Sequence, residues 1–258
     1  MVYQNLAFLG AALLLMMPNF AKAVCAPSDL ALGWLWNYNG TIGDKYWVRV
    51  TLTVTQGEVS GVYFYSTELK DIRVVGRVSD GRRLDLYELD AGGKVTARFE
   101  AEFPEHDPRG TVQGTLHCEV IAGSWHKIGA AQKLPVYLSL QDGTSGTLTH
   151  MYAVAGAQDD SLIHRNAFRF WQAVTMGDKP TVASLIDYPI KVNVVGTLKT
   201  IRTRDELLSE YDAIFSPAYR KAISAAMPRN MLARDQGIML GRGEVWFGAN
   251  GRVIALNN

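Results

Sequence analysis

Short β-favouring segments separated by turn residues fill the chain from residue 34 to residue 140, and this pattern constrains the fold more than any other feature. Residues 47–54 (WVRVTLTV) alternate with period two and are rich in β-branched side chains, which is typical of a strand. The sequence predicts an antiparallel meander over residues 28–142 that closes into a barrel or a sandwich. Further strands are expected at intervals of about 8 to 12 residues, with Asp-Gly and Gly-Gly turns between several of them, at 59–65, 72–78, 84–89, 95–103, 115–121, 123–127 and 135–140.

The pattern changes after Gly143, where helical periods replace the β pattern. Ser161 is placed to cap an amphipathic helix that contains Phe168 and Trp171. The sequence therefore predicts an α+β domain over residues 158–258. Its remaining elements are expected to be a short helix at 179–186, a strand at 188–194, a helix at 207–215 behind a capping box at 203–206, a helix at 218–226, and closing strands at 237–247 and 252–256.

Three segments of this second part carry a resemblance to a known family. They are 188–193 (YPIKVN), 211–215 (YDAIF) and 237–247 (GIMLGRGEVWF). Together with the order of the elements, they resemble the nuclear transport factor 2-like superfamily, in particular a module of exported bacterial proteins. The resemblance implies a cone in which leading helices cover a curved sheet. It implies no single reaction, because the superfamily includes enzymes, ligand binders and partner-binding domains. The first part is similar to small envelope β-barrels only in a general way.

The first 23 residues predict a secretion signal. Residues 6–17 are almost all apolar, a run too short to span a bilayer, which takes about 20 residues. The small-x-small pattern from Ala21 to Ala23 follows, as signal peptidase requires. A buried N-terminal core helix is the alternative, and a lipid anchor on Cys25 is rejected because Val24 precedes it. We therefore expect a periplasmic protein or, alternatively, one secreted from the cell.

The two cysteines, Cys25 and Cys118, suggest a disulfide bond in an oxidising compartment. Cleavage after Ala26 instead of Ala23 would remove Cys25, so this bond depends on where the signal is cut. No second apolar run of membrane length follows, so we expect no membrane span in the mature chain. The net charge is only +1, and the chain lacks the basic stripe that nucleic-acid binding requires.

The sequence contains no assembled catalytic, metal or cofactor motif. No two of the five histidines stand at the short spacing of a zinc site. Neither a Gly-x-Ser-x-Gly elbow nor a phosphate-binding Gly-Lys-Ser/Thr loop is present. We therefore expect no metal and no cofactor. Gly241-Arg242-Gly243 looks like a glycine-rich loop, but it lies within a strand pair, where a bulge or turn explains it better.

A hollow cone in the second part would let polar side chains act as acid and base inside an apolar cavity. The plainer interpretation places the carboxylates in solvent or in ion pairs, such as Glu244 with Arg252, and packs the aromatic rings into the core. The candidate ligand-binding residues are Asp187, Tyr188, Tyr211, Glu244, Trp246 and Trp171, with Asp212 as a further candidate acid.

Aromatic residues also cluster near the start of the first part. Trp34, Trp36 and Tyr38 are candidate partner-binding residues, because aromatic rings are enriched at recognition surfaces, although a small barrel also uses them to fill its interior. We therefore expect a non-enzymatic envelope protein that binds a protein partner or a cell-envelope component, as inhibitor- or immunity-like proteins do. The alternative is an enzyme or small-ligand binder that works in the cavity of the second part. The sequence predicts no oligomeric state.

Overall fold

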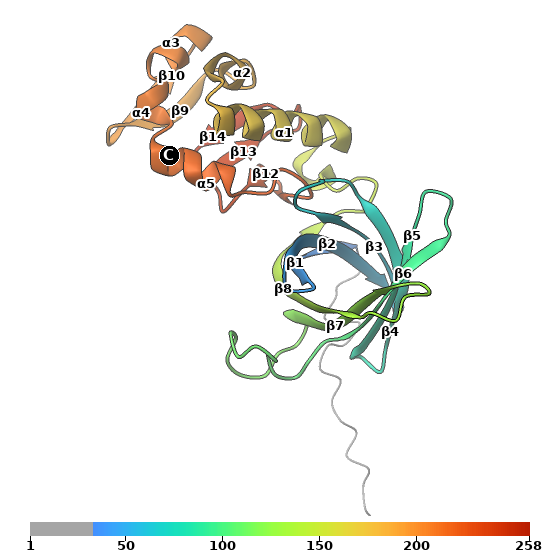
Figure 1. Ribbon diagram of the computed structural model, residues 1–258. Helices are drawn as coiled ribbons and strands as arrows, with labels where there is room; N and C mark the ends of the chain where they lie inside the picture. Colours follow the sequence, from blue (N-terminus) through green and yellow to red (C-terminus); the bar gives the residue numbers. More distant parts are fainter. Residues whose placement is uncertain (1–32) are drawn as a thin grey trace, which may run out of the picture.

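The computed structural model describes residues 33–258, and within them the chain forms an eight-stranded antiparallel barrel followed by a region of helices and further strands (Figure 1). Each barrel strand pairs with the next one along the chain, and the last pairs with the first, so this sheet has no free edge. The predicted meander is confirmed, and its closure decides for the barrel over the sandwich. The barrel strands are β1 (Trp34–Ile42), β2 (Tyr46–Thr55), β3 (Glu58–Tyr65), β4 (Ile72–Ser79), β5 (Arg83–Leu89), β6 (Val95–Glu102), β7 (Val120–Lys127) and β8 (Leu134–Ser145).

One stretch of the barrel differs from the prediction. The sequence predicts two strands at 115–121 and 123–127, whereas the structure has the single strand β7 across most of this range. Gly123 lies inside β7 opposite Ala101, where a side chain would collide with the backbone of β6. This glycine therefore allows two strands to approach closely, and it does not mark a turn.

The long connection between β6 and β7 is held in place by one carboxylate. Asp107 accepts hydrogen bonds from the backbone N–H groups of Thr111 and Val112 and from the Tyr137 hydroxyl of β8. Burial acts to raise the pKa of Asp107, but these hydrogen bonds together outweigh it and hold that pKa well below its ordinary value. The polar loop that begins at Pro104 is therefore held at the barrel surface by the hydrogen bonds of Asp107.

The barrel interior is filled by its own side chains. Inward positions carry aliphatic and aromatic residues, including Tyr38, Tyr63 and Phe99, whose rings are buried. A cavity between Tyr63, Phe99 and the aliphatic side chains around them has a volume of only about 10 Å³, which is at the lower limit for holding one water molecule. The interior of the barrel is therefore closely packed by its own side chains.

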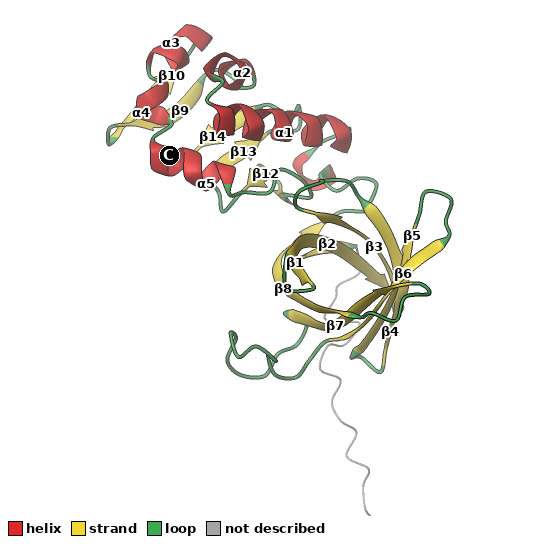
Figure 2. Cartoon of the chain, in the orientation of Figure 1, coloured by secondary structure: helices red, strands yellow, loops and turns green. Residues whose placement is uncertain are grey.

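The second region contains two sheets and a set of helices, which Figure 2 distinguishes by colour. The α+β class predicted for this part is confirmed. Strands β11 to β14 form one antiparallel sheet in chain order, and β9 pairs with β10 in a separate hairpin. The elements are η1 (Ala153–Ala155), α1 (Asp160–Met176), α2 (Lys179–Ser184), β9 (Ile190–Val194), β10 (Thr197–Ile201), α3 (Arg204–Ser209), α4 (Tyr211–Ile214), α5 (Pro217–Ser224), β11 (Leu232–Arg234), β12 (Gly237–Leu240), β13 (Val245–Phe247) and β14 (Val253–Leu256).

Two details of the helices correct the sequence prediction. The residue that caps α1 is Asp159, whose side chain accepts the backbone N–H of Ser161, so Ser161 is capped and is not itself the cap. The helix predicted at 207–215 is divided into α3 and α4, because Glu210 leaves the helical region with φ −100° and ψ 6°. The predicted cap at Thr203 is confirmed, since its side chain accepts the backbone N–H of Glu206.

The two regions have separate apolar cores that meet at the outer face of the barrel. One core fills the barrel, and the other is formed by α1, α5, β9 and the sheet of β11 to β14. Leu35 and Val62 belong to barrel strands but pack against the second core. Thr144 on β8 donates a hydrogen bond of 2.6 Å to the carbonyl of Ala233 on β11. The second region is therefore docked onto the barrel through buried contacts.

Candidate binding site

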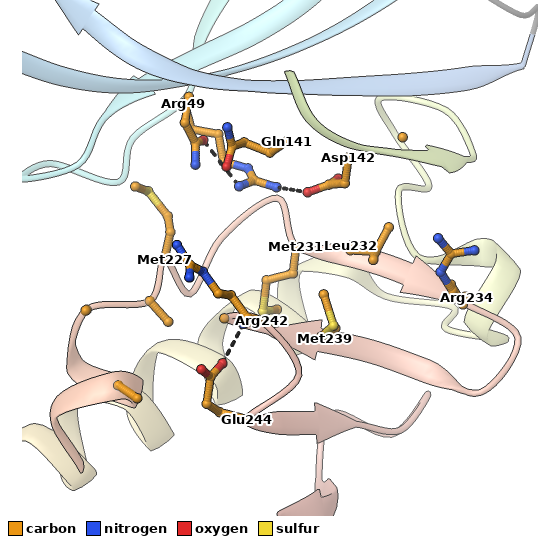
Figure 3. Close-up of a pocket in the computed structure, with 16 residues that line it drawn as sticks. Arg49, Gln141, Asp142, Met227, Met231, Leu232, Arg234, Met239, Arg242 and Glu244 are labelled. Atoms are coloured by element: carbon orange, nitrogen blue, oxygen red, sulfur yellow. Dashed lines mark hydrogen bonds and ion pairs between the residues drawn. The ribbon is translucent and has the colours of Figure 1, made fainter. Parts of the chain in front are cut away.

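A cleft of about 870 Å³ lies along this junction (Figure 3). One side is the outer face of β1, β2 and β8, and the other is built by residues 222–244 of the second region. The volume is in the range of about 300–1,000 Å³ that is typical of ligand sites. Because both regions line the cleft, neither could form it alone.

The barrel wall of the cleft is built around Arg49, which is only 7% exposed. It points outward from β2 because its neighbours Val48 and Val50 belong to the barrel core. Its Nη2 donates to Asp142 Oδ2 at 3.1 Å, and its Nη1 donates to Asn39 Oδ1 at 3.3 Å. Since the guanidinium is held from two sides, its position is set before any ligand arrives.

Behind Asp142, a chain of buried hydrogen bonds continues into the junction. Asn37 Nδ2 donates to Asp142 Oδ1 at 2.6 Å, and Thr51 Oγ1 donates to Asn37 Oδ1 at 2.7 Å. The series of hydrogen bonds reaches the second region at Asn230, whose Nδ2 donates to Thr51 Oγ1 at 3.1 Å. Buried polar groups are costly unless they are paired, so this series of hydrogen bonds selects one orientation of the two regions.

Part of the opposite side of the cleft is apolar. Met227, Met231 and Met239 line it, together with Leu232 and the alanines at the end of α5. Methionine side chains are unbranched and polarisable, and they adapt to guests of different shape. This surface can therefore accept an apolar group without demanding one exact outline.

The turn between β12 and β13 brings an arginine to the cleft. Gly241 in this turn has φ 74°, and a side chain there would collide with the Glu244 carboxylate. Glu244 accepts a hydrogen bond from the backbone N–H of Arg242. The carboxylate thus stabilises the turn, while the Arg242 side chain extends toward the barrel wall (Figure 3). The interpretation of the Gly-Arg-Gly segment as a turn agrees with the structure.

A second polar cluster lies elsewhere in the junction, at Tyr152 and His164. The Tyr152 hydroxyl accepts the backbone N–H of Met231 at 3.1 Å and lies 2.8 Å from His164 Nε2. Burial, and then the positive charge of Arg229, lower the pKa of His164 to about 4. Arg229 itself forms a double hydrogen bond to Asp71, at 2.8 and 2.6 Å, which ties the β3–β4 loop of the barrel to the second region.

The middle of the second region is packed with aromatic rings. Tyr211 is 1% exposed and stacks on Phe215 with ring centroids 4.6 Å apart. Phe170 of α1 meets Phe247 of β13 edge to face at 5.8 Å. The half-buried Trp171 packs against this core and donates its Nε1–H to the Ser224 carbonyl at 3.2 Å. These rings pack in the core of the second region, where the sequence places its candidate acid–base cavity.

The candidate acids of that cavity do not converge. The side chain of Asp187 is 45% exposed and lies 3.9 Å from the Arg252 guanidinium. Asp212 accepts a hydrogen bond from Lys179 at the surface. Of the predicted acids only Glu244 lines the cleft, and it does so from the turn described above.

The remaining members of the set are also apart from one another. The Tyr188 hydroxyl donates to the Ala183 carbonyl at 2.9 Å, and burial raises the pKa of Tyr188 to about 12. Trp246 is half-buried on β13. The pairing of Glu244 with Arg252 is not formed, because Arg252 donates to the carbonyls of Ser184 and Ile186.

The aromatic candidates of the barrel differ in how far they are exposed to solvent. Tyr38 is 1% exposed inside the barrel, where its hydroxyl donates to the Cys118 carbonyl at 2.8 Å, so it presents no surface to a partner. Trp36 is half-buried against the same core. Trp34 is 37% exposed and stacks on Trp36 with centroids 5.9 Å apart. Of the three, Trp34 alone offers an open face.

Several predictions fall outside the described residues. The signal of residues 1–23 and Cys25, the predicted disulfide partner of Cys118, both precede residue 33. Within residues 33–258, no group of three or more histidine, cysteine or carboxylate side chains is arranged to hold a metal ion. Among the same residues, no helix has the length and apolar character needed to cross a bilayer.

Comparison of the chain with protein-family models, with curated proteins and with solved structures gave no match. The resemblance of the second region to the nuclear transport factor 2-like superfamily therefore rests on its three sequence segments and on the order of its elements.

Sequence reasoning selected Glu244 but missed the arginines, the carboxylate and the methionines that make the cleft. An outward-facing Arg49 on a period-two strand resembles any solvent-facing residue. Nothing in the local pattern reveals that a second region covers it. Asn37 on β1 and Thr51 on β2 are partners across the two strands, and this outward-facing polar pair is the available signal of a buried junction.

Proposed function

We propose that this protein is an exported, non-enzymatic binding protein of the cell envelope that holds its partner in the cleft between the barrel and the second region. The observation that carries the proposal is the cleft itself, which has a volume of about 870 Å³ and an arginine fixed in its wall. A preorganised polar wall beside an adaptable apolar surface supplies both orientation and contact area.

The chemistry of the cleft supports binding over catalysis. Its two carboxylates already have internal roles, because Asp142 accepts from Arg49 and Asn37, and Glu244 accepts from the backbone of its own turn. A general acid or base must instead be free to reach a substrate proton. The alternative of an enzyme acting inside the second region loses support, since aromatic rings such as Phe170 fill that interior.

The location and the finer fold belong to the same proposal. An export signal at residues 1–23 and a disulfide between Cys25 and Cys118 fit a periplasmic protein, with release outside the cell as the alternative. The second region is proposed to be a nuclear transport factor 2-like module. Its helices α1 and α5 pack together in the same core as the β11–β14 sheet, which supports this assignment.

Affinity capture with a blocked cleft tests the proposal. Ala225 is exposed at the end of α5 and lines the cleft, so Ala225→Trp would fill it without disturbing the core. Leu198→Trp, on the exposed hairpin strand β10, is the matched control. An envelope component retained by the wild type and by the control should be lost with Ala225→Trp. Equal retention by all three proteins, or turnover of a small substrate without retention, contradicts the proposal.

A further inference from the structure

We propose that the partner enters the cleft as an extended acidic polypeptide segment, with carboxylates on Arg234 and Arg242 and an apolar side chain on Met239. This inference rests on the proposed function and adds the chemical class of the bound segment. It follows from the charges, the apolar surface and the hydrogen-bonding groups that face the cleft.

Two arginines give the cleft a positive charge. Neither Arg234 nor Arg242 has an ion pair with another described residue, and both are exposed. Asp142 is compensated by Arg49, whereas Glu244 keeps its negative charge, because its bond inside the described residues is from a neutral backbone N–H. The three arginines and two carboxylates that line the cleft still leave it a net positive charge of one. The cleft therefore presents two free guanidinium groups in a chain whose net charge is only +1. Guanidinium groups bind carboxylates in a planar, two-bonded geometry.

An apolar surface adjoins these two arginines in the cleft. Met239 lies on β12, within the sheet that carries Arg234 on the neighbouring strand β11, and Met227 and Met231 extend the same surface. An apolar side chain flanked by acidic ones would fit this arrangement. Because methionine adapts its shape, the site accepts different apolar residues at that position.

The barrel wall of the cleft contributes hydrogen-bonding groups. Asn39 uses its Oδ1 to accept from Arg49, and its Nδ2 has no partner among the described residues. Gln141 donates its Nε2–H groups to the carbonyls of Ser139 and Leu140, and its Oε1 has no partner within residues 33–258. One free donor and one free acceptor match the C=O and N–H of a peptide unit. An acyl chain would leave both unpaired, which favours a polypeptide over a lipid.

Fluorescence anisotropy with defined peptides tests the inference on the full mature chain. The probe is a short labelled peptide in which glutamate and leucine alternate. One matched peptide carries lysine in place of glutamate, and another carries serine in place of leucine. The protein variants are Arg234→Glu with Arg242→Glu, and Met239→Ser. The control is Arg165→Glu on α1, outside the cleft, and thermal melting verifies that each variant is folded.

We expect the acidic peptide to bind, and the binding to weaken as salt is raised. The double arginine variant should weaken it by at least about tenfold, and Met239→Ser by a smaller factor. Arg165→Glu should change it less than about twofold. The lysine peptide should not bind, and the serine peptide should bind more weakly.

Three results would overturn the inference. They are equal binding of the acidic and lysine peptides, no binding of the acidic peptide, and binding that ignores the arginine variants. Sedimentation with phosphatidylglycerol vesicles is a further arm, and vesicle binding that requires Arg234 and Arg242 without peptide binding also refutes it. If Ala225→Trp abolishes capture of an envelope component while the acidic peptide fails, the binding function stands and only the acidic segment is wrong.

Discussion

The two faces of the same barrel strands have opposite characters. On β2, Val48 and Val50 point inward to an apolar core with about 10 Å³ of free space, whereas Arg49 and Thr51 point outward into a polar junction beside a cleft of about 870 Å³. Residues adjacent in sequence thus lie in environments that differ in polarity, packing and access. The comparison teaches that this barrel packs its interior and places its polar groups and the larger cavity on its outer face.

This division also separates two kinds of interaction energy. The inner face stabilises the fold through area removed from water, which is large and non-directional. The outer face uses hydrogen bonds such as that from Asn230 to Thr51, whose net contribution is smaller but whose geometry is specific. If the division holds, mutations on the two faces should differ in size and in the property that they change.

The largest effect is expected on the inner face. Phe99→Ala removes a buried ring that packs against Tyr63 with centroids 5.4 Å apart. We expect a loss of about 3–5 kcal/mol in the free energy of unfolding, measured by urea titration. Trp47→Ala, on the exposed side of β2, should cost no more than about 0.5 kcal/mol. Equal costs for the two variants would mean that the interior is not the stabilising face.

The next effect is a pH dependence that arises at the junction. The pKa of His164 is about 4 in the folded protein and 6.5 in an unfolded chain. Between these values the unfolded chain binds more protons, so stability should fall as pH is lowered from about 6.5 to 4, by about 3 kcal/mol. Above this window the contribution of His164 should be constant.

The matched variant for this pH dependence is His164→Gln, which cannot titrate. Other groups change charge in the same range, so the quantity to measure is the difference in unfolding free energy between wild type and variant at each pH. As pH falls from about 6.5 to 4, the wild type should lose more unfolding free energy than His164→Gln does. Parallel pH profiles would show that His164 is not buried as described.

Removal of the carboxylate behind the cleft wall should have a smaller cost. Asp142→Ala leaves Arg49 without its ion-pair partner, and we expect a loss of about 2 kcal/mol because some solvent reaches Asp142. Adding Arg49→Met should recover part of this loss, since no unpaired charge then remains. Additive destabilisation in the double variant would contradict the pairing.

The smallest effect is expected for a single hydrogen bond across the junction. Thr144→Val keeps the shape of the side chain but removes the donor to the Ala233 carbonyl. Stability should fall by about 1 kcal/mol in urea unfolding. Thr149→Val, at an exposed position in the connection between the regions, should leave stability unchanged. A neutral Thr144→Val would mean that this contact does not hold the two regions together.

Much of the fold was predictable because it follows from local patterns. The period-two alternation of residues 47–54 indicates which side chains face the core. The capping residue Thr203 likewise indicates the start of α3. The failures have physical causes. Gly123 looks like a turn residue but permits close strand packing, and Ser161 has a better cap in its neighbour Asp159.

The candidate site was much less predictable than the fold. Tyr211 and Glu244 were selected for their residue type, yet the first packs in the core and the second stabilises a turn. Arg49 was passed over because an arginine on a strand is ordinarily exposed to solvent. Residue type alone did not distinguish side chains that stabilise the fold from side chains that can contact a partner.

The sequence by itself determined that this chain forms a meander of strands followed by an α+β region, because strand and helix periods depend only on near neighbours. Tertiary structure alone decided where a partner can bind. The cleft wall pairs Arg49 with Asp142, 93 residues apart, and the junction pairs Thr51 with Asn230, 179 residues apart. These contacts arise only when the barrel closes and the second region docks onto it. Patterns among near neighbours in the sequence do not predict either contact.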